Sequence, residues 1–277
     1  MSFHDLFPSN LTMLYFALVG LVAGFFGGLL GIGGGSITLP LLFFILRPMG
    51  IAIGLTNGEL MHVVIGTTFA SMFFNAAASV YFHHRQGSIQ WRLTLGLLPS
   101  LILGPIAGSF IATSLGGSVL RFSFGIFQVM TAVYFLLPGH KRVEVIDKTP
   151  HPVLLNLVAF VIGGIGSILG IGGGIIMVPF LDMMGMHIKK AIATSAFTSC
   201  IMLLVSALTF LLLGLQRPIP LPYHVGYIYL PAFFVIGFFS MLSAPLGVKV
   251  VHSLPIPLLK KVFALALATL GILLIIG

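Results

Sequence analysis

Two stretches of the sequence share a run of glycines that is suited to binding an anion. Residues 28–40 read GLLGIGGGSITLP, and residues 167–179 read SILGIGGGIIMVP. Three consecutive glycines interrupt a helix, and a helix that restarts after them presents unpaired N–H groups and the positive end of its dipole. Glycine also lets a ligand approach the backbone closely. We therefore predict that one anion site is formed by Gly31, Gly33, Gly34, Gly35, Gly170, Gly172, Gly173 and Gly174.

Hydroxyl and amide side chains accompany these glycines. Ser36 and Thr38 stand where the second stretch has Ile175 and Met177, so the first stretch is the better hydrogen-bond donor. We predict that further donors in the next apolar runs select among anions, namely Thr67, Thr68, Ser71, Asn75, Thr194 and Ser195. The alternative is a packing role, in which the hydroxyls bond backbone carbonyls of neighbouring helices and the glycines let helices approach.

Other reactive groups are scarce. Glu59, His62, Asp182 and His187 lie near the ends of apolar runs, where solvation at a membrane surface explains them, although a histidine there could carry a coupled proton. The sequence has a single cysteine, Cys200, and no HExxH, CxxC or Ser-His-Asp pattern. The glycine run also lacks the spacing of a dinucleotide or phosphate loop. We expect no enzyme activity, no cofactor and no metal.

The chain that must position these groups reads as an all-α polytopic membrane protein. Of 277 residues, 58% are apolar and only 6% are charged, and runs such as 6–46, 149–181 and 218–248 lack Asp, Glu, Lys and Arg entirely. A membrane-spanning helix needs about 20 apolar residues. The lipid bilayer is therefore the expected partner. The net charge is +8, and the basic residues responsible for it lie between these runs, where they set the orientation of the helices in the membrane. We therefore expect no nucleic-acid partner.

Both glycine motifs lie inside apolar runs that are too long for one span of about 20 residues. We predict that each run is two helical pieces around a glycine tip, 11–31 with 37–46 and 152–170 with 176–184. Pro40 and Pro179 are placed in the first turn of the second pieces, where a missing N–H is harmless.

The basic residues indicate that each broken run is a hairpin. If each run crossed the membrane once, Lys and Arg would divide six against seven, which gives no bias. If each run returns to its own side, three basic residues face ten, as the positive-inside rule requires. The three are Arg47, Arg121 and Arg217; the ten are Arg85, Arg92, Lys141, Arg142, Lys148, Lys189, Lys190, Lys249, Lys260 and Lys261.

A hairpin followed by three spans makes each half reverse direction an odd number of times. The predicted halves, 1–140 and 152–277, joined by a polar linker at 141–151, are therefore inverted repeats with both termini outside. Inverted repeats with broken helices at matching positions are typical of secondary transporters, whose site lies between the halves near the midplane.

The duplicated motif, from Gly24 to Leu41 and from Gly163 to Leu181, resembles that of the sulfite exporter TauE/SafE family of membrane permeases. The resemblance covers nearly the whole chain, and the family's motif residues correspond to the glycines above with Pro40 and Pro179. It implies a multi-pass transporter of sulfite, sulfoacetate or related organosulfonates in the bacterial cytoplasmic membrane. The resemblance does not fix the direction of transport, for which we expect export.

The leading hypothesis is thus a secondary transporter of a small sulfur-containing anion. A channel-like passive anion pore is the alternative, and an intramembrane enzyme lacks a reactive side chain. The sequence leaves open which anion is carried, in which direction, whether protons are coupled to it, and whether the chain forms a homodimer.

Overall fold

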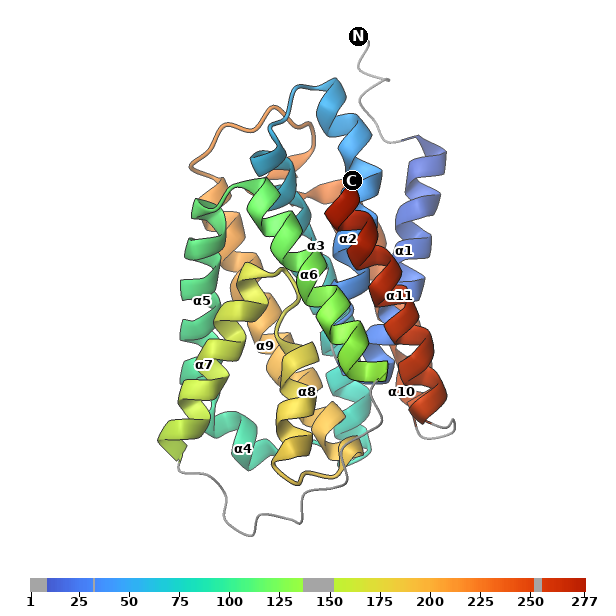
Figure 1. Cartoon of the computed structure of the whole chain (residues 1–277), viewed down its shortest axis with the longest axis vertical. Helices are drawn as coiled ribbons and strands as arrows, with labels where there is room; N and C mark the ends of the chain where they lie inside the picture. The colour runs from blue at the N-terminus through green and yellow to red at the C-terminus, as the bar shows by residue number, and fades with distance from the viewer. Residues whose placement is uncertain (1–8, 32, 137–151, 252–255) are drawn as a thin grey trace.

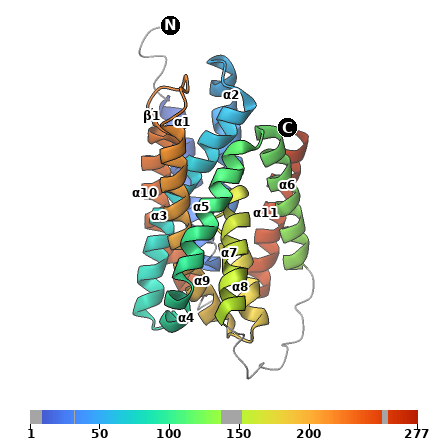
Figure 2. The ribbon, with the colours of Figure 1, turned by 90° about the vertical axis from the view of Figure 1, so that its left-hand side faces the viewer.

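The computed structural model describes residues 9–31, 33–136, 152–251 and 256–277, which form one elongated helical bundle (Figures 1 and 2). The predicted linker 141–151 lies outside the described residues. Within them the chain forms these elements: α1 (Asn10–Leu30), α2 (Gly35–Ala52), α3 (Asn57–Arg85), α4 (Trp91–Gly96), α5 (Leu98–Ser114), α6 (Gly117–Leu136), α7 (Pro152–Ile168), α8 (Gly174–Met183), α9 (Ile188–Gly214), β1 (His224–Val225), β2 (Ile228–Tyr229), α10 (Leu230–Val251) and α11 (Ile256–Ile276).

Six of the described helices are long and apolar enough to cross a membrane: α1, α2, α3, α6, α9 and α10. Helices α5, α7, α8 and most of α11 are shorter but also apolar. The bundle exposes many large apolar side chains, including Leu103, Met130 and Phe234, as a surface in contact with lipid does. The prediction of an all-α membrane protein is confirmed.

The two long apolar runs are broken at the glycine triplets, as predicted. Helix α1 ends at Leu30 and α2 begins at Gly35, while α7 ends at Ile168 and α8 begins at Gly174. The glycines between them have φ angles from +67° to +78°, a region that side chains other than glycine rarely adopt. The breaks follow directly from glycine's conformational freedom.

The predicted position of the two prolines is wrong by about one turn. Pro40 and Pro179 are each the sixth residue of their helices, not in the first turn, because α2 and α8 begin directly at the last glycine of each triplet. A proline inside a helix has no N–H to offer the carbonyl four residues earlier. The carbonyl of Ser36 is therefore free to accept from elsewhere.

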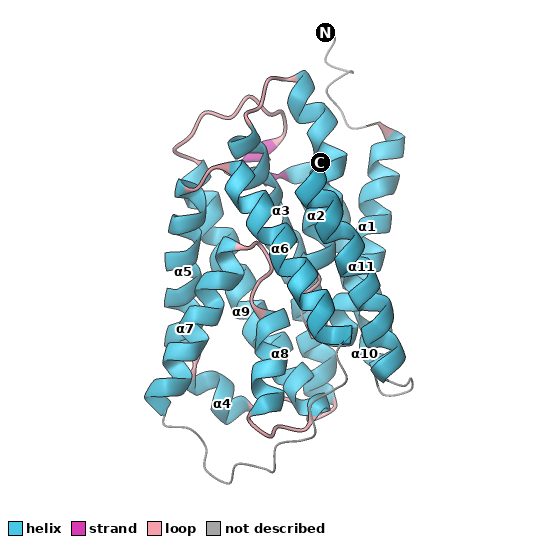
Figure 3. Ribbon diagram, viewed as in Figure 1, coloured by secondary structure: helices cyan, strands magenta, loops and turns pink. Residues whose placement is uncertain are grey.

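Each broken pair occupies one end of the bundle. In Figure 1, α1 runs from the upper end toward the middle and α2 returns to that end, where α3 and α6 also begin. Helices α7 and α8 make the corresponding excursion from the lower end, where α3 and α10 finish and α9 begins. The two breaks thus lie in the interior, and Figure 3 shows the one between α7 and α8 as a loop segment amid helices.

Glycines outside the triplets hold helices together. On α1, a Cβ built on Gly24 would lie 2.4 Å from Ser240 O, and one built on Gly28 would lie 2.3 Å from Ala244 O, both on α10. A Cβ on Gly108 of α5 would lie 2.2 Å from Gly164 O of α7. Backbones this close require the absence of side chains. The packing alternative is thus the observed role of these glycines.

Candidate functional site

The two glycine tips meet in the interior of the bundle. A Cβ built on Gly35 would lie 3.2 Å from the carbonyl oxygen of Gly170, so the first tip touches the second. Leu203 of α9 lies against both, within 2.9 Å of the Cβ position of Gly33 and 2.6 Å of that of Gly172. All sixteen residues of the predicted site are buried. The structure therefore brings the two halves of the predicted site together.

The start of each short helix offers backbone donors without a side-chain cap. The residues that precede them, Gly34 and Gly173, are left-handed with φ of 78° and 75°, and neither helix start has a side-chain capping bond. The first bonds back within α2 and α8 come from residues 37 and 176, to Gly34 O and Gly173 O. Both helix starts therefore present their earlier N–H groups and the positive end of a helix dipole to the buried interior.

Polar side chains surround the first tip. Asn75 of α3 donates through Nδ2 to the carbonyl of Gly33 at 3.1 Å, and Thr38 donates to Gly34 O at 3.2 Å. Gln128 of α6 donates through Nε2 to Ser36 O, the carbonyl that Pro40 leaves without an intrahelical partner. Side chains from two neighbouring helices therefore fix the backbone of the first tip.

Several polar atoms near this tip have no partner. In the described part of the chain, buried oxygen atoms without a hydrogen bond include Ser36 Oγ, Thr68 Oγ1, Ser199 Oγ, Asn75 Oδ1 and Gln128 Oε1. Ser199 Cβ lies 3.8 Å from the Cβ position of Gly33. Buried polar groups are nearly always hydrogen-bonded, so these exceptions call for a specific explanation.

The second tip is less polar. The Cβ position of Gly34 lies 2.9 Å from Met72 Sδ and 3.1 Å from Asn75 Nδ2, whereas that of Gly173 lies 2.5 Å from the sulfur of Met202 and 3.4 Å from the Ile162 side chain. The hydroxyl of Ser195 lies within 3.2 Å of Gly31 O and 3.1 Å of Gly174 O, one carbonyl from each tip. Ser195 therefore links the tips to each other, and the second tip adds few donors of its own.

The remaining predicted donors have other partners. Thr67 Oγ1 accepts from the backbone N–H of Tyr229 at 2.9 Å, and Thr194 Oγ1 accepts from that of Gln90 at 3.2 Å. Tyr229 is the last residue of β2, in the connection between α9 and α10, and Gln90 belongs to the loop after α3. The two threonines thus hold loops at opposite ends of the bundle. Ser71 donates within its own helix to Thr67 O and Thr68 O.

The four titratable residues singled out from the sequence lie at or near helix ends. Glu59 forms a capping box with Thr56 at the start of α3, accepting its N–H at 2.8 Å. His62 Nε2 lies 3.2 Å from Ala112 O, and Asp182 and His187 are exposed. Burial raises the pKa of the Tyr229 phenol to about 12, so this side chain stays neutral. None of the sixteen predicted site residues is titratable.

Sequence reasoning missed Gln128 and did not include Ser199 in the site. A lone amide in an apolar helix was the available signal for Gln128, because burying it in a membrane is costly without a partner.

Comparisons with known proteins match the chain to a family of membrane transporters. The family model described as "Sulfite exporter TauE/SafE" matches residues 16–274. A "Probable membrane transporter protein" of Haemophilus influenzae is 35% identical over 92% of this chain and 95% of its own length. Proteins with the same description from Methanocaldococcus jannaschii and Bacillus subtilis are 26% and 23% identical, over 92% and 79% of this chain and 92% and 82% of their own lengths. No solved structure matches the chain.

Proposed function

Because the chain belongs to the sulfite exporter TauE/SafE family of membrane transporters, we propose that it exports a small sulfur-containing anion across the bacterial cytoplasmic membrane. Sulfite, sulfoacetate and other organosulfonates are the cargo class. The observation that supports the proposal is the contact between the two glycine tips in the buried interior, each tip being followed by an uncapped helix start. The positive dipole ends of these helix starts favour an anion in a buried site of low dielectric.

The first tip supplies the directed hydrogen bonds. Ser36 and Thr68 hydroxyls, which are buried and unpartnered, can each donate to a sulfonate or sulfite oxygen. Asn75 uses one of the two N–H groups of its amide to bond Gly33 O, and this bond holds the tip in position. The preferred anion is selected by these donors, because a buried oxygen left without its bond costs about 1–3 kcal/mol.

The proposed architecture is an inverted repeat. It is supported by matching contacts in the two halves: α1 packs on α10 and α7 on α5, while α6 meets α11 where Gly125 and Gly271 approach each other. Arg47, Arg121 and Arg217 belong to the upper end, and the other described basic residues belong to the lower end. By the positive-inside rule the lower end faces the cytoplasm and both termini face outward.

Alternating access follows from two loop contacts. The bond from Tyr229 N to Thr67 joins a loop of the second half to α3 of the first, and the bond from Gln90 N to Thr194 joins a loop of the first half to α9 of the second. We propose that these contacts close the upper and lower ends respectively. If one of these contacts opens while the other stays closed, the tips would be exposed to one side of the membrane at a time.

The test is uptake of radiolabelled sulfite, sulfoacetate and chloride into proteoliposomes under varied pH gradients. Thr68→Val removes an unpartnered hydroxyl without changing side-chain shape, and Ser71→Ala removes one that is satisfied within its helix. We expect Thr68→Val to weaken the preferred sulfur anion by about five- to 100-fold relative to chloride, and Ser71→Ala to leave the ratio unchanged.

Three results would contradict parts of this proposal. Equal loss for all anions in Thr68→Val would mean that its hydroxyl does not select the cargo. If the anion flux does not saturate as the anion concentration rises, and if a pH gradient does not change it, the protein would be a passive pore. Failure of the wild-type protein to move any sulfur anion would refute the cargo class itself.

A further inference from the structure

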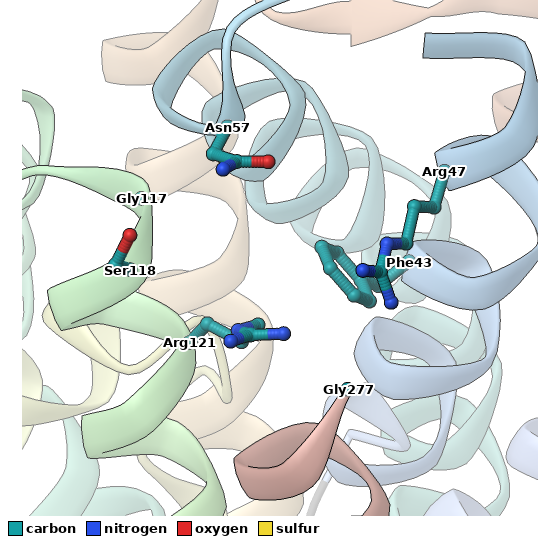
Figure 4. Close-up of a pocket in the computed structure, with 7 residues that line it drawn as sticks. All are labelled: Phe43, Arg47, Asn57, Gly117, Ser118, Arg121 and Gly277. Atoms are coloured by element: carbon teal, nitrogen blue, oxygen red, sulfur yellow. The ribbon is translucent and has the colours of Figure 1, made fainter. Parts of the chain in front are cut away.

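A pocket at the upper end of the bundle brings together two arginines that are far apart in the sequence. It is lined by Phe43 and Arg47 of α2, Arg121 of α6, the start of α3 and α6, and Gly277 (Figure 4). Its volume is about 80 Å³, several times the space that one water molecule needs. The pocket therefore has room for a small polyatomic ion and not for a bulky ligand.

The two guanidinium groups share one aromatic ring. Cζ of Arg47 lies 5.9 Å and Cζ of Arg121 6.0 Å from the centroid of the Phe43 ring, so the two charges lie within about 12 Å of each other. Phe43 is 4% exposed and cannot move away easily. Both arginines therefore make cation–π contacts with the same buried ring, which favours their orientation toward it.

In the described part of the chain, neither arginine forms an ion pair with an aspartate or glutamate side chain, and Glu59, the acidic residue along α3, is engaged in its capping box. Gly277, the last residue of the sequence, also lines the pocket, and a Cβ built on it would lie 3.4 Å from Arg47 Nη1. A single terminal carboxylate there balances one of the two guanidinium charges and leaves the other for a ligand.

The backbone adds to the positive potential. Helices α3 and α6 both begin at the pocket, and the Cβ position of Gly117 lies 2.1 Å from Asn57 O, so the two helix starts touch. The first bond within α6 is donated by Leu120, to Gly116 O, which leaves the earlier N–H groups and the hydroxyl of Ser118 on the pocket side. Arginine forks and helix starts both suit the oxygen atoms of one anionic group.

We propose that this pocket is a second anion site, at the outer mouth of the transporter and separate from the glycine tips, that binds a group of the sulfonate, sulfate or phosphate type. The ligand is either a free oxyanion or the phosphate of a lipid headgroup. Only its placement at the outer mouth rests on the proposed function; the site itself is argued from the pocket, the two arginines and the helix starts, and does not require that the tips bind the cargo.

The experiment measures protection of individual arginines. Purified protein in lipid-free detergent is treated with phenylglyoxal, which modifies accessible arginine side chains, and the extent at each arginine is read by mass spectrometry. Inorganic sulfate is the free-anion probe, and sodium chloride at equal ionic strength is the control. Arg217, exposed at the same end and outside the pocket, is the internal reference.

We expect sulfate to slow modification of Arg47 and Arg121 together and to leave Arg217 unchanged. At about ten times its dissociation constant the anion slows both reactions about tenfold, because only the free fraction of the site reacts. In Arg121→Gln, sulfate should no longer protect Arg47, whereas Arg217→Gln should preserve the protection. The side chain of Arg121 is partly exposed and that of Arg217 is exposed, so we expect both variants to fold.

A second set of measurements, in lipid nanodiscs, distinguishes a free oxyanion from a lipid headgroup as the ligand. Nanodiscs of phosphatidylglycerol that protect both arginines, when sulfate in detergent does not, would assign the site to lipid headgroups. If neither sulfate nor phosphatidylglycerol slows modification of Arg47 and Arg121 relative to Arg217, the proposal is wrong. Because the readout is at these two side chains, failure of the tips to bind cargo would not produce that result.

Discussion

The two threonines that hold loops at opposite ends provide a sharp test of the gating contacts. Thr67→Val keeps the shape of the side chain but removes the oxygen that accepts from Tyr229 N at 2.9 Å. This bond is buried, so water cannot readily replace the lost acceptor. An unsatisfied buried N–H costs about 1–3 kcal/mol, which corresponds to about a five- to 150-fold larger opening constant for that loop.

Thr194→Val is the matched variant at the other end. Its bond to Gln90 N is longer, at 3.2 Å, and only part-buried, so water can compensate for part of the loss. We therefore expect a smaller effect, up to about tenfold. Ser71→Ala is the control, because that hydroxyl bonds only to carbonyls of its own helix.

Amide hydrogen exchange in detergent measures both openings. Thr67→Val should speed exchange of the Tyr229 amide and leave that of Gln90 unchanged, and Thr194→Val should do the reverse. Ser71→Ala should change neither. Faster exchange at both amides in Thr67→Val would indicate general destabilisation, and an unchanged Tyr229 amide would show that the threonine does not hold the loop. Either result would refute the assignment of these contacts as separate gates.

Three other predictions concern topology, packing and the first tip. In a cysteine-free background, cysteines at Met49 and Lys190 should be labelled from outside and from the cytoplasm respectively; labelling of both from one side would exclude the hairpin arrangement. Gly28→Ala, whose Cβ would lie 2.3 Å from a backbone oxygen, should lower stability by about 1–3 kcal/mol in thermal unfolding, whereas Gly96→Ala, with nothing within 4 Å, should be neutral or slightly stabilising. Gln128→Leu should lower stability by about 1–3 kcal/mol and reduce thermal stabilisation by sulfoacetate, since Ser36 O loses its donor; unchanged stabilisation would separate Gln128 from the site.

The broken helices could be predicted from the glycine triplets and from the distribution of the basic residues along the sequence. Three adjacent glycines break a helix by local physics alone, and the basic residues favour a hairpin without any knowledge of packing. The convergence of the two tips also follows from their duplication. Pro40 was misplaced because the exact residue at which a helix restarts depends on the glycine conformation, not on the proline.

The partner of each hydroxyl was not predictable in the same way. Thr67 and Thr68 are neighbours of the same type, yet one accepts from a distant loop and the other is unpartnered. Gln128 reaches Ser36 from 92 residues away, because α6 happens to pass the start of α2. Such assignments depend on how helices rotate against each other, which the periodicity of an almost uniformly apolar sequence does not specify.

The difference between the two tips bears on how many anions the site holds. Donors gather at the first tip, where Ser36 and Asn75 are found, while the second has Met177 and Met202. If both tips were equally polar, each could bind an anion. Two anions this close together would repel each other strongly in a medium of low dielectric. On the proposed function, the less polar second tip would add its helix dipole to the field at one anion and hold none of its own. The proposal therefore predicts one anion per transport cycle, bound mainly to the half that contains α2.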